Sequence, residues 1–421
     1  MYGANEIAVD GNPQTDVRYI RITDIDDHGN LRDEDWKTAE KVNEKYALDR
    51  NDLLFARSGA TTGKAFIHKR EDGEAIFAGY LIRFRFDETR VNPFFVFYYT
   101  LLSRYKLWVR VIQRPSGQPN INSREFKAFE IPLLPPSIQN HIVTIMRSAY
   151  DQKKRKEQEA NALLDSIDDY VLKELGIEMP VVEEKKCFVV YADEMAGRRV
   201  DSFYYQSKFR NVDRIMKNVQ FDVFNLGTLI SEISSGATPK VDENYYADSS
   251  TGVPFLRVQN VTRHGIDLSD AKFITPEVHS GMLKRSQLKK DDLVFTITGR
   301  IGSVAVVPDI FEGNINQHSV RFHLKKQITN TTINPNYVAA FLNSELGKSL
   351  SIREVTGGTR PALDYKALKS LQIILPSIEI QDKIVTEIKN RLAKAEELRR
   401  EADAIVEQAK ERVERILLPE E

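Results

Sequence analysis

Few residues of this chain have the types and spacing that catalysis requires. The segment 59–64, Gly-Ala-Thr-Thr-Gly-Lys, resembles a phosphate-binding loop. It is one residue short between its two glycines, and Ala65 stands where such a loop needs a hydroxyl to hold magnesium. We therefore do not expect a nucleotide site here.

Two Asn-Pro pairs, Asn92-Pro93 and Asn334-Pro335, are each followed closely by an aromatic residue. They are similar to the catalytic Asn-Pro-Pro-aromatic motif of amino-methyltransferases, but both lack the second proline and no glycine-rich cofactor loop precedes them. Because proline is favoured at the first position of a helix, these pairs predict two helix starts, and the helix from Asn92 is expected to continue to about Trp108.

Other catalytic or metal-binding patterns are also missing. The seven histidines have no metal-ligand spacing, and His318 lies in a predicted strand. No set of serine, histidine and acidic residue stands out. We predict a chain that is not an enzyme by itself and that binds no metal or cofactor directly.

Signals for binding are stronger. Residues 89–124 and 313–344 contain no acidic residue. Basic residues without neighbouring acids favour contact with phosphate, and the alternative is ordinary solvated surface charge. These basic residues are Arg90, Arg104, Lys106, Arg110, Arg114 and Arg124 in the first segment and Arg321, Lys325 and Lys326 in the second.

Loops that combine glycine with polar side chains could reach the edges of DNA bases, because glycine allows a close backbone approach and forked side chains can pair with bases. Ordinary turn chemistry is the alternative for any one of these residues. Arg360 is the strongest single candidate for a base or phosphate contact. The candidates are Arg57, Ser58, Thr61, Thr62, Lys64, Tyr80, Arg114, Ser116, Gln118, Asn120 and Asn122, and then Gln259, Asn260, Thr298, Arg300, Gln317, His318, Thr359 and Arg360.

The elements that must position these loops occur twice. Short runs with strand-like alternation dominate residues 1–136, and this block is expected to end in a strand over 129–134. The same runs return in residues 221–376 at offsets of 236 to 242. Such a long internal repeat indicates a duplicated domain. The clearest pairs are Val17–Ile25 with Val253–Val261, Asp52–Gly59 with Asp292–Gly299, Arg83-Phe84 with Arg321-Phe322, and the two Asn-Pro pairs.

Each block ends in a Leu-Pro opening that predicts a long helix, because proline fixes the backbone at a helix start and Ser137 or Ser377 can cap the first turn. The first helix is predicted over 137–175 and the second over 377–421. The second has a coiled-coil seam, which requires a partner helix. Its seam residues are Ile384, Ile388, Leu392, Ala395, Leu398, Ala402, Ile405, Ala409, Val413 and Ile416.

The composition narrows the class of protein. The chain has 421 residues, enough for two or three domains, and its 60 basic and 61 acidic residues point to no particular partner. A single cysteine, Cys187, excludes a disulfide framework and favours a reducing cytoplasm. We see no signal sequence, and the longest apolar run, 94–102, is too short to span a bilayer, so we expect no membrane association.

In this order, and twice over, these segments resemble the specificity (S, or HsdS) subunits of type I restriction–modification enzymes. The resemblance covers nearly the whole chain. It is carried by the paired segments 52–59 and 292–299, by the loop 357–361 and by the two Leu-Pro helix openings. The segment 199–205, Arg-Val-Asp-Ser-Phe-Tyr-Tyr, is also similar to the family's entry into its second recognition domain.

The resemblance implies an α/β fold with two duplicated target recognition domains, separated by two long helices packed as an antiparallel coiled coil. The domains would be residues 1–136 and 221–376, the helices 137–176 and 377–421, and the connector 177–220. Each domain would read one half of a bipartite target in double-stranded DNA, and the helices would fix the gap between the halves.

The resemblance also implies partners. Methyltransferase (M) subunits would use S-adenosylmethionine, and restriction (R) subunits would use ATP and magnesium, in a prokaryotic cytoplasm. Two alternatives remain open. The chain could serve a type II-like system that acts without ATP-driven translocation. It could instead be a coiled-coil scaffold whose blocks bind protein, and salt would then affect the binding little.

The first block departs from the second at its start. About 32 residues precede Val253 in the second block, but only 16 precede Val17 in the first. The first block is therefore expected to lack its opening strand and helix. Either the reading frame starts late or the missing piece is supplied from elsewhere.

Overall fold

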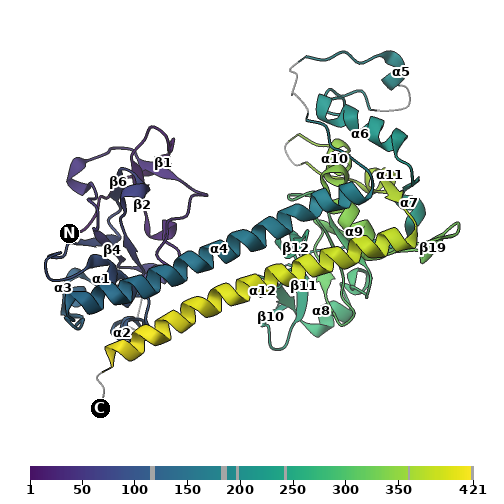
Figure 1. Cartoon of the computed structure of the whole chain (residues 1–421). Coiled ribbons are helices and arrows are strands. Elements are labelled where there is room, and N and C mark those ends of the chain that lie inside the picture. Colours follow the sequence, from purple (N-terminus) through teal and green to yellow (C-terminus); the bar gives the residue numbers. More distant parts are fainter. Residues whose placement is uncertain (114–118, 182–186, 196–198, 241–243, 359–360, 419–421) are drawn as a thin grey trace. The chain divides into compact units, whose positions relative to one another are not determined.

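The computed structural model describes residues 1–113, 119–181, 187–195, 199–240, 244–358 and 361–418 (Figure 1). The chain divides into two compact units, one of residues 1–158 with 398–421 and the other of residues 159–397. Two long helices, α4 (Pro136–Glu174) and α12 (Ile378–Leu417), each contribute one part to each unit. Among the described residues, no helix is both long enough and apolar enough to cross a membrane.

The first unit is built on a three-stranded antiparallel sheet in the order β5-β4-β7. All four residues of β4 are buried, as an apolar run in a central strand should be. Beside this sheet, β2 pairs with β6 in parallel and β1 pairs with β3 in antiparallel fashion. The bounds are β1 Ala8–Asp10, β2 Arg18–Ile20, β3 Lys37–Ala39, β4 Leu53–Ala56, β5 Ala65–Ile67, β6 Ala75–Phe77, β7 Leu81–Phe84, α1 Pro93–Tyr99, α2 Ser103–Ile112 and α3 Ser123–Ala128.

The second unit repeats this arrangement with an extra strand. Its main sheet has the order β16-β15-β18-β9, and β11 pairs with β17 in parallel, as β2 does with β6. Helices α9, α10 and α11 follow in the same order as α1, α2 and α3. The main bounds are β8 Asp222–Asn225, α7 Leu226–Leu229, β9 Ile230–Ser235, β11 Val253–Leu256, β15 Leu293–Thr296, β16 Val304–Val306, β17 Asn314–Ile315, β18 Ser319–Leu324, α9 Pro335–Asn343, α10 Glu345–Arg353, α11 Tyr365–Ser370 and β21 Gln372–Leu375.

Smaller elements complete the second unit. The connector contains α5 and α6, and α6 packs against α10. The strand pairs β10–β14, β12–β13 and β19–β20 are antiparallel. The bounds are α5 Ala192–Met195, α6 Ser207–Asn218, β10 Tyr246–Ala247, β12 Val261–Thr262, β13 Gly265–Ile266, β14 Lys272–Ile274, α8 Pro276–Ser280, β19 Gln327–Ile328 and β20 Thr331–Thr332.

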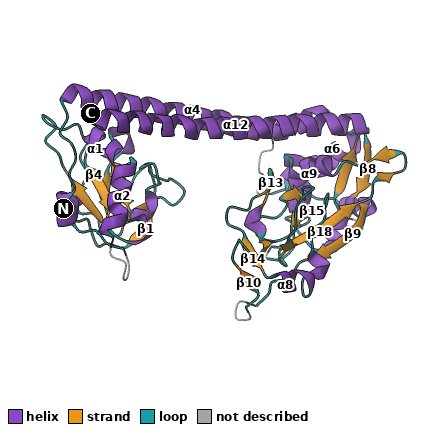
Figure 2. Ribbon diagram, turned by 90° about the horizontal axis from the view of Figure 1, so that it is seen from below, coloured by secondary structure: helices purple, strands orange, loops and turns teal. Residues whose placement is uncertain are grey.

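The two long helices pack antiparallel within each unit (Figure 2). In the first unit, Lys156 Nζ lies 2.5 Å from a carboxylate oxygen of Glu401. In the second, Arg391 donates to the carbonyl of Ser166 at 2.8 Å, and Lys383 pairs with Glu174 at 2.7 Å. The predicted α/β fold with two antiparallel long helices is confirmed. The predicted seam residues of α12 are buried or half-buried.

Some local predictions were wrong. The helix predicted from Asn92 to about Trp108 is two helices, because Leu102 is extended, with φ −83° and ψ 160°, and buries its side chain. Ser137 does not cap α4, since the helix already begins at Pro136. His318 lies in the turn before β18 rather than in the strand. Residues 129–134 form no strand, for want of a described partner strand like β8, which pairs with β21 in the second unit.

A buried glutamine fastens each long helix to its block. Gln139 Oε1 accepts the backbone N–H of Asn92 at 2.7 Å, and its Nε2 donates to the carbonyls of Arg90 and Leu134. In the second unit, Gln381 makes the same bonds to Asn334, Thr332 and Pro376. Both glutamines are at most 1% exposed. The glutamine shared by the two Leu-Pro openings therefore holds the helix onto the start of α1 or α9.

We expect Gln139→Leu to lower the free energy of unfolding of the first unit by about 1–3 kcal/mol, because one buried N–H and two carbonyls lose their partner. Urea unfolding measures this change. Gln152→Leu, at an exposed position of the same helix, is the matched control and should change stability by less than about 0.5 kcal/mol. Equal effects of the two substitutions would contradict the fastening role.

Candidate nucleic-acid interface

Three loops of the first block meet at one residue, Arg57, which follows β4. The backbone N–H of Arg57 donates to the carbonyl of Tyr80 at 3.0 Å, and its carbonyl accepts the N–H of Ile121 at 2.8 Å. Ser58 and Asn120 form a further antiparallel bridge. The loop after β4, the turn before β7 and the segment before α3 are thus joined. We call Arg57, Tyr80 and Asn120 the first loop cluster.

The second block joins the same three loops in the same way. The N–H of Ile297 donates to the carbonyl of His318 at 3.0 Å, and its carbonyl accepts the N–H of Leu363 at 2.9 Å. Thr298 forms a bridge with Ala362, as Ser58 does with Asn120. We call Thr298, Gln317 and His318 the second loop cluster.

In the first loop cluster, a cation lies over an aromatic ring. The Arg57 guanidinium carbon is 4.9 Å from the ring centroid of Tyr2, and both Nε and Nη2 lie 3.5 Å from Asn120 Oδ1. The side chain of Tyr80 is exposed. This arrangement presents a forked donor, an amide and a phenol beside one another, and these groups suit base edges and phosphates.

In the second loop cluster, the side chains form a relay. The hydroxyl of Thr238 donates to Gln317 Oε1, and Gln317 Nε2 lies 3.3 Å from His318 Nε2. If this amide donates, His318 carries its proton on Nδ1, which lies 2.7 Å from Thr298 Oγ1. We assign that tautomer because the amide nitrogen of Gln317 can only donate, so His318 Nε2 must accept. It leaves the hydroxyl proton of Thr298 available to a ligand.

A buried carboxylate lies at the opposite end of the strands that carry these loops. Asp292, which is not exposed at all, accepts from Arg321 at 3.1 Å and lies 3.0 Å from His323 Nδ1. In the first block, Asp52 pairs with Arg83 at 3.4 Å and with Arg85 at 2.7 Å. The repeated Asp-Leu and Arg-Phe segments of the sequence are therefore two ends of one ion pair between neighbouring strands.

Several side chains that the sequence suggested for DNA contact make hydrogen bonds within the protein instead. Asn122 Oδ1 caps α3 by accepting two N–H groups, and Asn260 is buried with its side chain bonded to Arg257 and Asp267. These two side chains have little to offer DNA in this conformation. Thr62 donates to the carbonyl of Gly59.

Two more candidates are held by carboxylates. Lys64 pairs with Asp27 at 2.8 Å and lowers the pKa of that carboxyl. Gln259 donates to Asp270 at 3.3 Å, and this bond, with the charge of Arg257, lowers the pKa of Asp270.

The remaining candidates for DNA contact include two buried hydroxyls, one exposed arginine and five residues that the structure does not describe. Within the described residues, the hydroxyls of Ser58 and Thr61 are buried and have no hydrogen-bond partner. Arg300 is exposed beside Gly299, whose φ is +69°. Arg114, Ser116, Gln118, Thr359 and Arg360 lie outside the described residues.

Sequence reasoning missed Tyr2 and Thr238. Both precede their block's first matched strand, and each reaches its loop cluster only through the fold. The signal in the sequence was the alignment of Gly3 with Gly236, which lie close to Tyr2 and Thr238 in the chain. Both positions need glycine, because an added Cβ at either one would lie within 2.4 Å of two backbone carbonyl oxygens.

The basic residues of segments 89–124 and 313–344 fall into two groups, those that are exposed and those that are bonded within the protein. Arg104, Lys106 and Arg110 are exposed along α2, where a phosphate could reach them. Arg321, in contrast, is buried in its pair with Asp292 and is not available to a phosphate. Lys325 donates to the carbonyl of Thr228.

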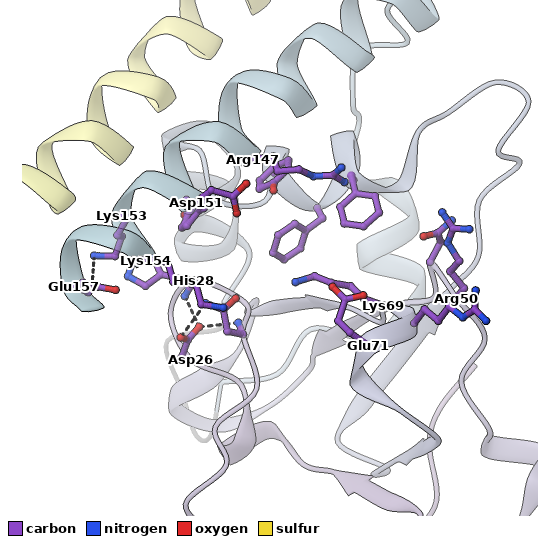
Figure 3. Close-up of a pocket in the computed structure, with 17 residues that line it drawn as sticks. Asp26, His28, Arg50, Lys69, Glu71, Arg147, Asp151, Lys153, Lys154 and Glu157 are labelled. Atoms are coloured by element: carbon purple, nitrogen blue, oxygen red, sulfur yellow. Dashed lines mark hydrogen bonds and ion pairs between the residues drawn. The ribbon is translucent and has the colours of Figure 1, made fainter. Parts of the chain in front are cut away.

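The first unit also has a cavity of about 910 Å³ between the block and α4 (Figure 3). Arg147 and Asp151 reach it from α4, and Lys69 and Glu71 reach it from the block. Burial raises the pKa of Tyr150, which also lines it. The charges are of both signs, and the cavity contains no member of the first loop cluster. Among the described residues, no group of three or more histidine, cysteine or acidic side chains is placed to hold a metal ion.

Comparison with known proteins decides the family. The model of the type I restriction modification DNA specificity domain matches residues 10–165 and 218–405, well over half of the chain. The chain belongs to this family. The predicted relation to specificity subunits is confirmed. As a specificity subunit the chain is not itself the enzyme, because catalysis in these systems lies in partner subunits.

Three relatives illustrate the relation. Over 156 residues the chain is 27% identical to the specificity subunit of type I restriction enzyme EcoBI of Escherichia coli, covering 37% of this chain and 32% of that one. This match thus spans about a third of the relative's length. Identity is 21% over 371 residues to the EcoKI specificity subunit of E. coli, covering 86% and 72%. It is 22% over 388 residues to the MjaVIII specificity subunit of Methanocaldococcus jannaschii, covering 91% and 81%.

Asp292→Ala should lower the free energy of unfolding by about 3–5 kcal/mol, because it removes the buried carboxylate partner of Arg321 and leaves only the exposed carboxylate of Glu232 at 3.7 Å. Chemical denaturation measures the loss. Asp309→Ala, at an exposed carboxylate paired with Lys290, is the control and should cost at most about 1 kcal/mol. Adding Arg321→Met to Asp292→Ala should restore part of the stability, and no restoration would contradict a paired role.

Proposed function

We propose that each loop cluster reads one half of a bipartite double-stranded DNA target. The observation that supports this most is the contrast between backbone and side chains. Equivalent backbone hydrogen bonds join the three loops in both blocks, while the side chains they present are Arg57, Tyr80 and Asn120 in one and Thr298, Gln317 and His318 in the other. A shared frame with different polar groups is what two readers of different sequences need.

The two clusters would read by different chemistry. Arg57 offers a forked donor that matches the two acceptors of guanine, or a phosphate, and Asn120 beside it can pair with adenine. Thr298 offers one hydroxyl proton, fixed in direction by the His318 and Gln317 relay. The exposed cations of α2 would contact the DNA backbone, which contributes affinity without sequence information.

The chemistry would come from partner subunits. We propose that M subunits bind this chain and use S-adenosylmethionine to methylate the target, and that R subunits use ATP and magnesium to cleave unmodified DNA. The helices α4 and α12 would dock M subunits and set the gap between the half-sites. The assembly would act on host DNA in a prokaryotic cytoplasm. These roles rest on family membership, which links the chain to specificity subunits.

The first test is the methylation pattern of the host genome with the gene intact and deleted. We expect deletion to remove methylation at one bipartite motif and re-introduction of the gene to restore it. An unchanged pattern in cells that express the M subunit would contradict the proposal. Cleavage by the purified assembly without ATP would instead indicate the type II-like alternative.

The second test separates the two clusters. Arg57→Ala should relax sequence preference in one half-site and Thr298→Val in the other, each by about 1–3 kcal/mol of discrimination. Methylation of a library with randomised half-sites measures both preferences. Arg70→Ala, at an exposed cation away from the first loop cluster, is the control and should leave both preferences unchanged. If either reading variant alters both half-sites or neither, the assignment is wrong.

A further inference from the structure

The first unit has an apolar groove beside β7. A cavity of about 230 Å³ opens here, and its lining includes Phe84, Phe86, Phe126, Phe129 and Ile131. Phe84, Phe86, Phe129 and Ile131 are only half-buried. Aromatic and aliphatic side chains around an open cavity are typical of a binding groove.

The internal repeat shows what fills the equivalent place in the second unit. There the segment β8–α7–β9 lies between β18 and β21, and its Leu226 and Leu229 are completely buried. The N–H of Leu226 donates to the carbonyl of Leu371 at 2.7 Å, and the N–H of Lys325 donates to the carbonyl of Leu229 at 2.8 Å. Leu371 is the counterpart of Phe129 at the offset of 242 that relates α3 to α11.

Equivalent residues of the two units differ in exposure, and those of the second unit, which β8–α7–β9 covers, are the more buried. Phe322 and Ile373, the counterparts of Phe84 and Ile131, are not exposed at all. The clearest contrast lies at the end of the last strand, where Leu375 is 3% exposed and its counterpart Leu133 is 60% exposed. The first unit thus keeps these apolar side chains, but its described residues include no segment that covers them as β8–α7–β9 does in the second unit.

The backbone of the first unit is also ready to pair. In the second unit, the backbone groups of Ile373 and Leu375 face β8, since Leu371 accepts the N–H of Leu226 directly after that strand and bonded positions alternate. Ile374 faces away, and its carbonyl accepts from Tyr337. The counterpart of Ile374 is Pro132, which has no N–H and would need none at an outward position.

The space ends at Met1. Gly3 and Tyr2 take the places of Gly236 and Ser235 against β7, and Met1 exchanges backbone hydrogen bonds with Arg83. Within the described residues, no strand continues this pairing along Phe84 to Phe86.

A second surface of the first unit, on α2, is exposed where the equivalent surface of the second unit, on α10, is covered. In the second unit, α6 covers α10, and Arg353 of α10 is 5% exposed in a pair with Asp213 of α6 at 2.5 Å. Its counterpart on α2 is Val111, which is 75% exposed. Both open surfaces correspond to places that residues 207–235 cover in the second unit.

We propose that the groove binds a strand–turn–strand segment of a partner polypeptide with a Leu-Gly-Xaa-Leu turn. The first strand would pair with residues 130–133, the two leucines would fill the cavity, and the second strand would extend along β7. Glycine is required after the first leucine, because a Cβ at Gly227 would lie 2.9 Å from Lys369 Cβ, and Lys127 is the counterpart of that lysine. Binding of such a segment does not require that either loop cluster reads DNA.

The test uses the full chain and a labelled synthetic peptide with the sequence of residues 221–233. We expect saturable binding of one peptide per chain and slower hydrogen exchange at residues 84–86 and 129–134. A peptide carrying Leu226→Asp and Leu229→Asp should bind at least about tenfold more weakly, because charge cannot enter the apolar cavity.

Variants of the protein provide the second arm. Ile131→Asp should weaken binding of the unmodified peptide to a similar extent, and Ile310→Asp, at a fully exposed position of the second unit, should not. Absence of saturable binding would overturn the proposal, as would equal binding of the two peptides. Exchange protection at residues 371–377 in place of 129–134 would also overturn it, because the peptide would then be replacing the second unit's own segment.

Discussion

One residue's backbone holds each candidate reading site together. Arg57 and Ile297 occupy the same position, and each uses its N–H for one loop and its carbonyl for another. Since main-chain groups make these bonds, the side chain at that position is free to change, and it differs between the blocks as much as arginine differs from isoleucine. Sequence preference can therefore vary without loss of the frame. The buried pairs of Asp52 with Arg83 and Asp292 with Arg321 fix the far ends of the same strands.

The fold was largely predictable because its signals are local and repeated. Asn92 and Asn334 accept N–H groups at their helix starts, as the Asn-Pro pairs indicated. The failures lie where distant residues decide. Residues 129–134 have strand-like composition, but a strand requires a partner, and composition alone does not reveal whether one is present. Similarly, the break at Leu102 follows from burial of that side chain in the core, which helix periodicity does not report.

The candidate site was less predictable, since residue type does not distinguish a reading group from a structural one. Asn120 and Asn122 are two positions apart, yet one is exposed beside Arg57 and the other caps α3. Asn260 and Gln259 likewise differ in burial although both are amides. A capping asparagine directly precedes a helix start, so Asn122 before the helix at Ser123 could have been recognised. Tyr2 and Thr238 needed the folded structure, because only the fold brings them to the loops.

The two blocks also show how a repeat can diverge at its edges while its centre stays constant. The residues around β4 and β15 keep their apolar character and burial, because each is surrounded by its own block. At the groove beside β7, burial is lost but apolar character is not: Phe84, Phe86 and Leu133 are as large and as apolar as their counterparts. An apolar groove next to an unpaired strand edge promotes unspecific association when it is left open. Polar substitutions there would remove that liability at little cost to the core, and their absence from these positions favours a groove that is covered when the protein works.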